Sequence, residues 1–219
     1  MNTEIILNFL KDLKANNNRD WFIENKKIYQ AARTEFQDIL KALIDGIGKF
    51  DDRIQDLEPK DCMFRINRDI RFSKDKSPYK TNFGGVIAQG GKKSPNPCYY
   101  LHFEPGNVFL AGGIYMPEAN ILKKIRQEID YNAKVLKNVI EKPAFRKLFG
   151  EIEGDKLKKA PKDYAIDHPD IELLKLKSYI IIHRLANGEP VKKDFIESCL
   201  KIYKMMKPYN DFLTVAVSD

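Results

Sequence analysis

Residues 98–115 read CYYLHFEPGNVFLAGGIY, and this stretch decides the predicted fold because it has the pattern of a β-hairpin. Two runs rich in aromatic and apolar residues flank the turn sequence Glu-Pro-Gly-Asn at 104–107, as in paired antiparallel strands. With Pro105 and Gly106 as the loop, the expected core-face pairs are Phe103 with Val108, Leu101 with Leu110 and Tyr99 with Gly112. The other face then holds a mixed surface able to line a pocket, formed by Tyr100, His102, Glu104 and Phe109. A slip of one residue would exchange the two faces.

Helical patterns flank this hairpin on both sides. Apolar residues recur every three or four positions over 5–13 and 21–47, and Asn18 is placed to cap the second helix. Further helices are expected from Pro117, Pro143 and Phe195, with a buried strand over 178–184. These elements predict an α+β fold, with a mainly antiparallel sheet packed against N-terminal and C-terminal helices.

The length of 219 residues and the 43% hydrophobic content predict one domain, spanning 1–219. Within it, residues 1–50 form a helical N-terminal part and residues 60–116 an antiparallel β block with a basic loop. Residues 117–219 contribute helices and one further strand. Nothing in this pattern reveals the oligomeric state.

The most unusual stretch is RINRDIRFSKDKSPYK, residues 65–80. It follows an expected half-buried strand in which Cys62, Phe64 and Ile66 alternate with polar or longer side chains. Six Lys or Arg and two Asp give it a net charge of +4, out of +7 for the whole chain. The positive charge is therefore concentrated in one loop, and it favours anionic partners.

Three arginines at three-residue intervals make this loop a candidate anion site. The guanidinium forks of Arg65, Arg68 and Arg71 suit bidentate binding of phosphate or carboxylate. The loop's further expected ligand contacts are Lys76, Tyr79 and Lys80, and the expected pocket walls are Trp21, Asn25, Asp69 and His168. The ordinary alternative is a surface salt-bridge network, in which Asp69 and Asp75 neutralise their neighbours.

Three classes of function fit such a loop. The leading hypothesis is a pocket for a small molecule that bears a phosphate or a carboxylate. The rivals are a nucleic-acid-binding module that contacts phosphates through the same loop, and a docking protein for an acidic partner. The groups suited to proton transfer are Asp69, Asp75, His168 and Tyr79. No nucleophile stands out, so the catalytic residues and the existence of an enzymatic reaction stay open.

Several short stretches invite comparison with known functional motifs, but the surrounding sequence does not support the function that each motif would predict. Ser73 and Lys76 match the Ser-x-x-Lys motif, but Pro78 interrupts any helix there and the companion boxes of that enzyme class do not occur. The glycine pairs lack the P-loop pattern, and Gly112 with Gly113 indicates a bulge or a close backbone approach. No ligand spacing predicts a metal site around His168, and no cofactor is indicated.

The composition also bears on the cellular setting. No apolar run approaches the roughly 20 residues of a membrane-spanning helix, and the N-terminus has the pattern of an amphipathic helix rather than a signal peptide. Cys62, Cys98 and Cys199 are widely spaced and odd in number, which predicts no disulfide framework. A reduced, cytoplasmic setting without membrane contact is the expectation.

Longer motifs resemble a known family. These are Asp20-Trp-Phe with Asn25-Lys and Tyr29, residues 65–80, Gly112-Gly-x-Tyr-x-Pro117, and residues 161–177 with Asp167-His-Pro. Together they resemble the family catalogued as domain of unknown function 2461, over nearly the whole chain. The resemblance implies a stand-alone, mostly bacterial, soluble α+β protein, and it brings no established activity, cofactor or catalytic residue. Asp163 stands where the family pattern leads us to expect glycine.

Overall fold

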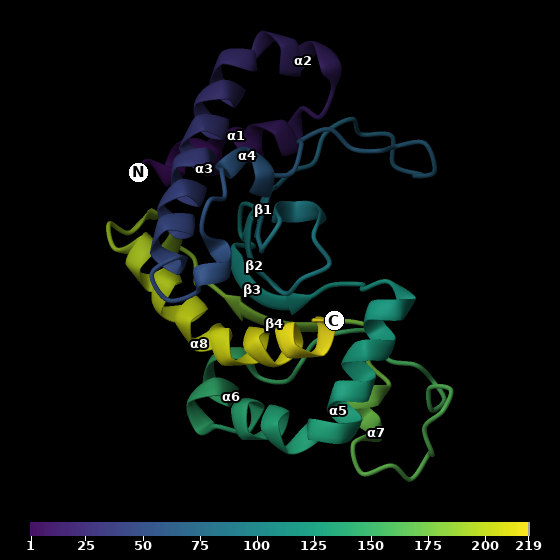
Figure 1. Cartoon of the computed structure of the whole chain (residues 1–219). Coiled ribbons are helices and arrows are strands. Elements are labelled where there is room, and N and C mark those ends of the chain that lie inside the picture. Colours follow the sequence, from purple (N-terminus) through teal and green to yellow (C-terminus); the bar gives the residue numbers. More distant parts are fainter. Residues whose placement is uncertain (219) are drawn as a thin grey trace.

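The computed structural model describes residues 1–218, in which helices pack around one antiparallel sheet (Figure 1). The fold is α+β, as the sequence predicts. The strands are β1 (Phe83–Ile87), β2 (Cys98–Phe103), β3 (Phe109–Ile114) and β4 (Tyr179–Arg184). The α-helices are α1 (Thr3–Ala15), α2 (Arg19–Glu24), α3 (Lys26–Ile47), α4 (Pro59–Cys62), α5 (Ala119–Ile140), α6 (Pro143–Phe149), α7 (Ile171–Leu174) and α8 (Phe195–Val217). The short 3-10 helices are η1 (Asp52–Ile54), η2 (Gly91–Lys93) and η3 (Glu189–Val191).

The four strands follow the order β1-β2-β3-β4, and each pairs antiparallel with its neighbour. The predicted register of the central hairpin is confirmed, because Leu101 pairs with Leu110 and Tyr99 with Gly112. In the connecting turn, the N–H of Asn107 donates to the carbonyl of Glu104 at 2.9 Å. Gly106 has a φ of +76°, which a turn of type II requires at its third residue.

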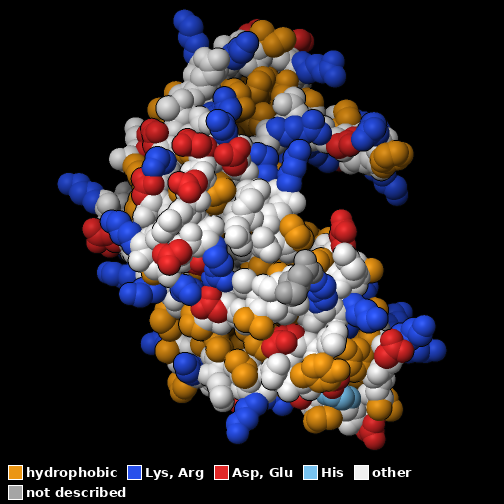
Figure 2. All heavy atoms as spheres, viewed as in Figure 1, with side chains coloured by type: hydrophobic (Ala, Val, Ile, Leu, Met, Phe, Trp, Pro, Cys, Tyr) orange, Lys and Arg blue, Asp and Glu red, His pale blue; other side chains and the backbone are white. Residues whose placement is uncertain are grey.

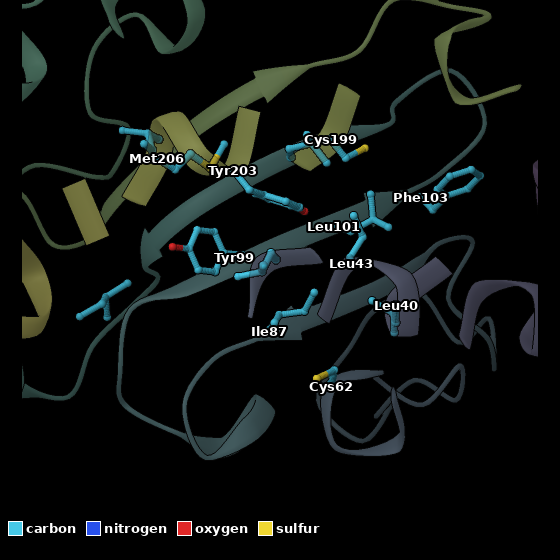
Figure 3. Packing of buried hydrophobic residues seen from close by; sticks show 14 of the residues in the cluster. Leu40, Leu43, Cys62, Ile87, Tyr99, Leu101, Phe103, Cys199, Tyr203 and Met206 are labelled. Carbon is cyan, nitrogen blue, oxygen red and sulfur yellow. The ribbon is translucent and has the colours of Figure 1, made fainter. Parts of the chain in front are cut away.

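One face of the sheet forms the core. Tyr99, Leu101 and Phe103 on β2 are at most 1% exposed, and Leu110 on β3 is fully buried. Helices α3 and α8 cover this face (Figure 1), and Figure 3 shows their side chains converging on the strands. The helical residues labelled there are Leu40 and Leu43 of α3, and Cys199, Tyr203 and Met206 of α8.

A partly buried polar network ties Tyr99 in the core to helix α8. The Asp51 carboxylate is 3% exposed and accepts hydrogen bonds from Arg53 Nε at 2.7 Å and from the Tyr99 hydroxyl at 2.8 Å. Arg53 Nη2 also donates to Asp211 of α8 at 2.6 Å. Burial acts to raise the pKa of Asp51, but the hydrogen bonds from Arg53 and Tyr99 outweigh it, and this pKa is lowered.

Two expectations for the N-terminal half are corrected. The strand expected from Cys62 does not form, because Cys62 ends the short helix α4 and only isolated bridges join Met63 to Gly85 and Asn67 to Tyr79. The single helix expected over 21–47 is divided into α2 and α3 at Asn25. The expected cap is confirmed, since the side chain of Asn18 accepts from the backbone N–H of Trp21.

The expected buried strand over 178–184 is present as β4, but only one of its faces is in the core. Tyr179 and Ile181 are fully buried, whereas Ile180 and Ile182 on the other face are half-buried. Among residues 1–218, no helix has the length and apolar character needed to cross a membrane. All three cysteines are free thiols.

Gly113 lies where β3 comes unusually close to β4. Its φ of +107° belongs to the left-handed region, and a Cβ added there would overlap the carbonyl oxygen of Tyr179. The close backbone approach that the glycine pair indicated is therefore present. A side chain at this position is excluded both by backbone conformation and by space.

We expect Gly113→Ala to lower the free energy of unfolding by at least about 2 kcal/mol, because backbone strain adds to the overlap with β4. Gly106→Ala is the matched control: its φ is also positive, but nothing lies near the added Cβ. Urea denaturation of both variants measures the difference. Equal losses would show that the approach of β3 to β4 is not the cause.

Asp163 adopts the backbone conformation of the glycine that the family pattern leads us to expect there. Its φ is +74°, which costs an L-residue roughly 1–2 kcal/mol. Aspartate tolerates this region better than most residues because its short side chain hydrogen-bonds locally. The backbone conformation at this position therefore favours glycine, and aspartate occupies it at a cost in stability.

Asp163→Gly should raise the free energy of unfolding by up to about 1 kcal/mol. The relief of strain exceeds the roughly 0.4–1 kcal/mol by which glycine stabilises the unfolded chain. Asp163→Ala is the control and should be destabilising, because alanine keeps the strained backbone conformation and lacks the local hydrogen bonding that lets aspartate tolerate it. Thermal and urea unfolding measure both changes, and a loss of stability in the glycine variant would contradict the explanation.

Candidate functional site

The basic loop of residues 65–80 projects from the body of the molecule between α4 and β1 (Figure 1). Its two arms are joined at the base by backbone hydrogen bonds. The N–H of Arg68 donates to the carbonyl of Pro78 at 2.9 Å, and the N–H of Lys80 donates to the carbonyl of Ile66 at 2.8 Å. The loop is therefore an irregular hairpin with a defined base.

Asn17 and Phe22 anchor the returning arm to the N-terminal helices. The side-chain amide of Asn17 donates to the carbonyl of Tyr79 at 3.0 Å and accepts from its N–H at 3.1 Å. The Tyr79 ring is 8% exposed and stacks on Phe22, with the ring centroids 4.0 Å apart. The loop base is thus held by a paired hydrogen bond and by an aromatic stack.

Two of the three arginines are neutralised within the loop. Arg71 forms a fork with Asp69, from Nε at 3.0 Å and Nη2 at 2.6 Å, on the exposed part of the loop. Arg68 pairs with Asp75, whose pKa is lowered to about 2 by hydrogen bonds from Ser77 and from Arg68. The salt-bridge network considered as the ordinary alternative is present for these two residues.

Two of the other four cations of the loop, Arg65 and Lys80, lie at its base. Within residues 1–218, neither Arg65 nor Lys80 has a carboxylate partner in salt-bridge range. The ammonium group of Lys80 lies 5.3 Å from the centroid of the Phe64 ring. Burial and the neighbouring charge of Arg65 both lower the pKa of Lys80, so an added anion would relieve an unfavourable environment.

A polar cavity of about 390 Å³, which we call the basic cleft, lies between the loop base and the end of α1. Figure 2 shows Lys and Arg side chains gathered on the loop and at its base. Asp75 is the one carboxylate among the residues that line the cleft, and it already binds Arg68. The lining residues are Lys14, Asn17, Arg68, Asp75, Ser77, Tyr79, Lys80, Thr81 and Asn82.

The sequence-predicted site residues divide into three groups. Arg68, Tyr79 and Lys80 meet in the basic cleft. Lys76 lines a neighbouring hollow with Arg19 and donates to the carbonyl of Ile70 at 2.9 Å. Those that line neither cavity are Arg65, Asp69, Arg71, Trp21, Asn25 and His168.

Trp21 and Asn25 have structural surroundings in the N-terminal helices. Trp21 stacks on Phe9, with ring centroids 6.2 Å apart. The amide of Asn25 donates to the carbonyl of Trp21 at 2.8 Å, where α2 ends and α3 begins. His168 lies elsewhere in the fold, 2.9 Å from Asp130 of α5, and it accepts the N–H of Asp170.

Three residues of the basic cleft had no individual signal in the sequence. Lys14 is an ordinary charged residue near the end of an amphipathic helix. Thr81 and Asn82 are unremarkable polar residues before β1. Only the fold brings them beside the loop, so no local spacing rule could have selected them.

A second polar group lies along β2, on the face of the sheet turned away from the core. The Tyr100 hydroxyl lies 3.0 Å from His102 Nδ1, and His102 Nε2 lies 3.4 Å from Glu104. An ionised carboxylate only accepts, so the neutral imidazole carries its proton on Nε2 and accepts from Tyr100 on Nδ1. His102 also stacks on Phe109, with centroids 4.5 Å apart.

Burial sets the protonation of this group. It lowers the pKa of His102, although Glu104 acts in the opposite direction. It raises the pKa of Tyr100 to about 12, so the phenol is protonated at neutral pH. Burial likewise tends to raise the pKa of Glu104, but hydrogen bonds from Asn107 and His102 outweigh it and the pKa is lowered. At neutral pH the group therefore consists of a protonated phenol, a neutral imidazole and an ionised carboxylate.

The structure was also searched for side chains that could together bind a metal ion. Among residues 1–218, no group of three or more His, Cys, Asp or Glu side chains could hold a metal ion. The cation-rich cleft itself has a single carboxylate.

These features describe an α+β protein with a one-sided antiparallel sheet and a projecting basic loop. The family model described as conserved hypothetical protein (DUF2461) matches residues 5–212, and the chain belongs to this family. Comparisons with curated proteins and with solved structures found no match.

The protonation of His102 predicts a pH dependence of stability. Its folded-state pKa is lowered, so below about pH 6.5 the unfolded chain takes up a proton more readily than the folded protein. Stability should therefore fall as the pH drops through about 6.5 towards the folded-state pKa. His102→Gln keeps a polar side chain without this titration and should show a flatter dependence.

Urea denaturation at several pH values between about 5 and 7.5 measures this effect, with His183→Gln as a control from the neighbouring strand β4. If wild type and His102→Gln respond identically to pH, the burial of a neutral His102 does not control stability in this range.

Proposed function

We propose that this is a cytoplasmic, single-domain protein that binds a phosphate- or carboxylate-bearing small ligand in the basic cleft. The observation that carries the proposal is the convergence of Lys14, Arg68 and Lys80 on one cavity of about 390 Å³. These cations come from α1 and from the two arms of the loop, so they form a cleft rather than a linear charged run. The volume lies within the roughly 300–1,000 Å³ of small-molecule sites.

The electrostatics of the cleft support an anionic ligand. Arg68 is held in position by Asp75 and by the carbonyl of Ser77 at 3.2 Å, so its orientation is set before a ligand arrives. Lys80 has a lowered pKa and no carboxylate partner within the described chain. Asn17, Thr81 and Asn82 add neutral polar groups to the lining. The proposal concerns binding and assigns no reaction.

One observation favours nucleic acid as a second candidate. Phe72 is 95% exposed near the tip of the loop, and the Arg71 guanidinium lies 5.8 Å from its ring centroid. An exposed aromatic ring between Arg71 and Lys74 resembles the arrangement on which single-stranded bases stack. In this reading the contacts lie on the exposed tip, away from the basic cleft.

We expect Lys14→Gln to weaken the binding of inorganic phosphate or citrate by about tenfold or more, because it removes one charge-assisted contact. Lys74→Gln is the matched control, since Lys74 belongs to the same loop but does not line the cleft. Isothermal titration calorimetry at low salt measures both affinities. Arg68 is unsuitable as the test position because it also joins the arms of the loop.

The same variants separate the two candidates when a short single-stranded oligonucleotide is the probe. Phe72→Ala should abolish an interaction based on stacking and leave phosphate binding intact. An oligonucleotide affinity that falls steeply with salt and depends on Phe72, with no binding of small anions, would refute the cleft proposal in favour of nucleic acid.

A further inference from the structure

The face of the sheet turned away from α3 and α8 carries a groove of about 490 Å³. Alternation along the strands directs half-buried side chains to this face. We call this cavity the open-face groove. The residues that matter for its chemistry are Phe64, Val86, Tyr100, Phe109, Ala111 and Ile182.

The groove is almost entirely apolar. Its two hydroxyl groups belong to Tyr100, which is already within hydrogen-bond distance of His102 Nδ1, and to Tyr115, whose side chain is exposed at the rim. Its thiol belongs to Cys98, whose pKa is raised to about 12 by burial and which is therefore protonated. A polar or charged ligand body would lose hydration here without gaining enough partners, so the groove suits a hydrocarbon or aromatic body.

Positive charge lies at one edge of this groove. Phe64 lines the groove, and the ammonium group of Lys80 lies 5.3 Å from the centroid of its ring. Arg65 follows Phe64 in the chain and is close enough to Lys80 to lower its pKa. Neither cation has a carboxylate in salt-bridge range within residues 1–218. The apolar groove therefore adjoins two cations that form no salt bridge within the described chain.

We propose that the open-face groove binds the apolar body of an amphipathic anion, whose carboxylate or phosphate group is held by Lys80 and Arg65. The inference rests on the proposed function, because Lys80 lines the basic cleft and also borders the groove. It extends that function by naming the ligand class. A single chain or ring system fits a cavity of about 490 Å³, within the range of small-molecule sites.

Charge complementarity is the argument for this occupant. An apolar ligand without a charge would leave Lys80 and Arg65 in mutual repulsion, and a cationic ligand would add to it. A small anion without an apolar body would leave the hydrophobic lining in contact with water. An amphipathic anion satisfies both parts of the site at once.

Decanoate, used below its micelle concentration, is the probe that tests the inference by isothermal titration calorimetry. Wild type should bind it at least tenfold more tightly than acetate, decanol or decyltrimethylammonium. Ala111→Phe fills the groove from β3 and should weaken decanoate binding at least tenfold while phosphate binding stays unchanged. Lys80→Gln should weaken decanoate binding, whereas Lys74→Gln should not.

Ile182→Trp fills the same groove from β4 and replaces Ala111→Phe if circular dichroism shows that the latter misfolds. Decanoate affinity unchanged by a folded, groove-filling variant would overturn the inference, as would equally tight binding of decanol. If the protein binds phosphatidylglycerol vesicles but not monomeric decanoate, the inference is overturned, and this face is instead a surface that contacts membranes.

The probes also separate this inference from the proposed function. One outcome is that Lys14→Gln loses phosphate binding while wild type shows no preference for decanoate over acetate. This outcome would support the basic cleft as an anion site and refute the open-face groove as a ligand site. Absence of both phosphate and decanoate binding to wild type would refute both.

Discussion

The burial of only one face of the sheet is the constraint on which the rest of the structure depends. Side chains alternate along a strand, so packing α3 and α8 against Tyr99, Leu101 and Leu110 necessarily turns their neighbours outward. The outward residues of β2 include Tyr100 and His102, which are half-buried rather than solvated. The core and the open-face groove are therefore two consequences of a single hairpin register.

A second feature is the rigid attachment of the basic loop. The paired hydrogen bonds between Asn17 and Tyr79, and the stack of Tyr79 on Phe22, hold the loop base against the N-terminal helices. The loop's two aspartates form salt bridges with Arg71 and Arg68, whereas Arg65 and Lys80 form no salt bridge within the described chain. The proposed anion site lies at this base, where Lys80 is partly desolvated. A preformed arrangement of this kind reduces the entropic cost of binding.

Periodicity predicted the fold well because it reports directly on burial. The hairpin register, the α+β class and the Asn18 cap were all readable from local patterns. The same reasoning failed for residues 62–67, where alternation of Cys62, Phe64 and Ile66 looked like a strand. Phe64 is in fact 37% exposed, and only isolated bridges form there. A run of six residues is too short for periodicity to distinguish a strand from an extended segment.

The sequence by itself determined which faces are apolar, where the turns occur and where positive charge accumulates, because these depend on neighbouring residues. Only the tertiary structure decided which cations share a cavity. Lys14 meets Lys80 because α1 packs beside the loop base, and Phe64 borders the sheet because the chain returns along β1. It also placed Trp21 in an aromatic stack and His168 beside Asp130, away from the loop. Such contacts join residues distant in the chain, and in one sequence no local pattern encodes that proximity.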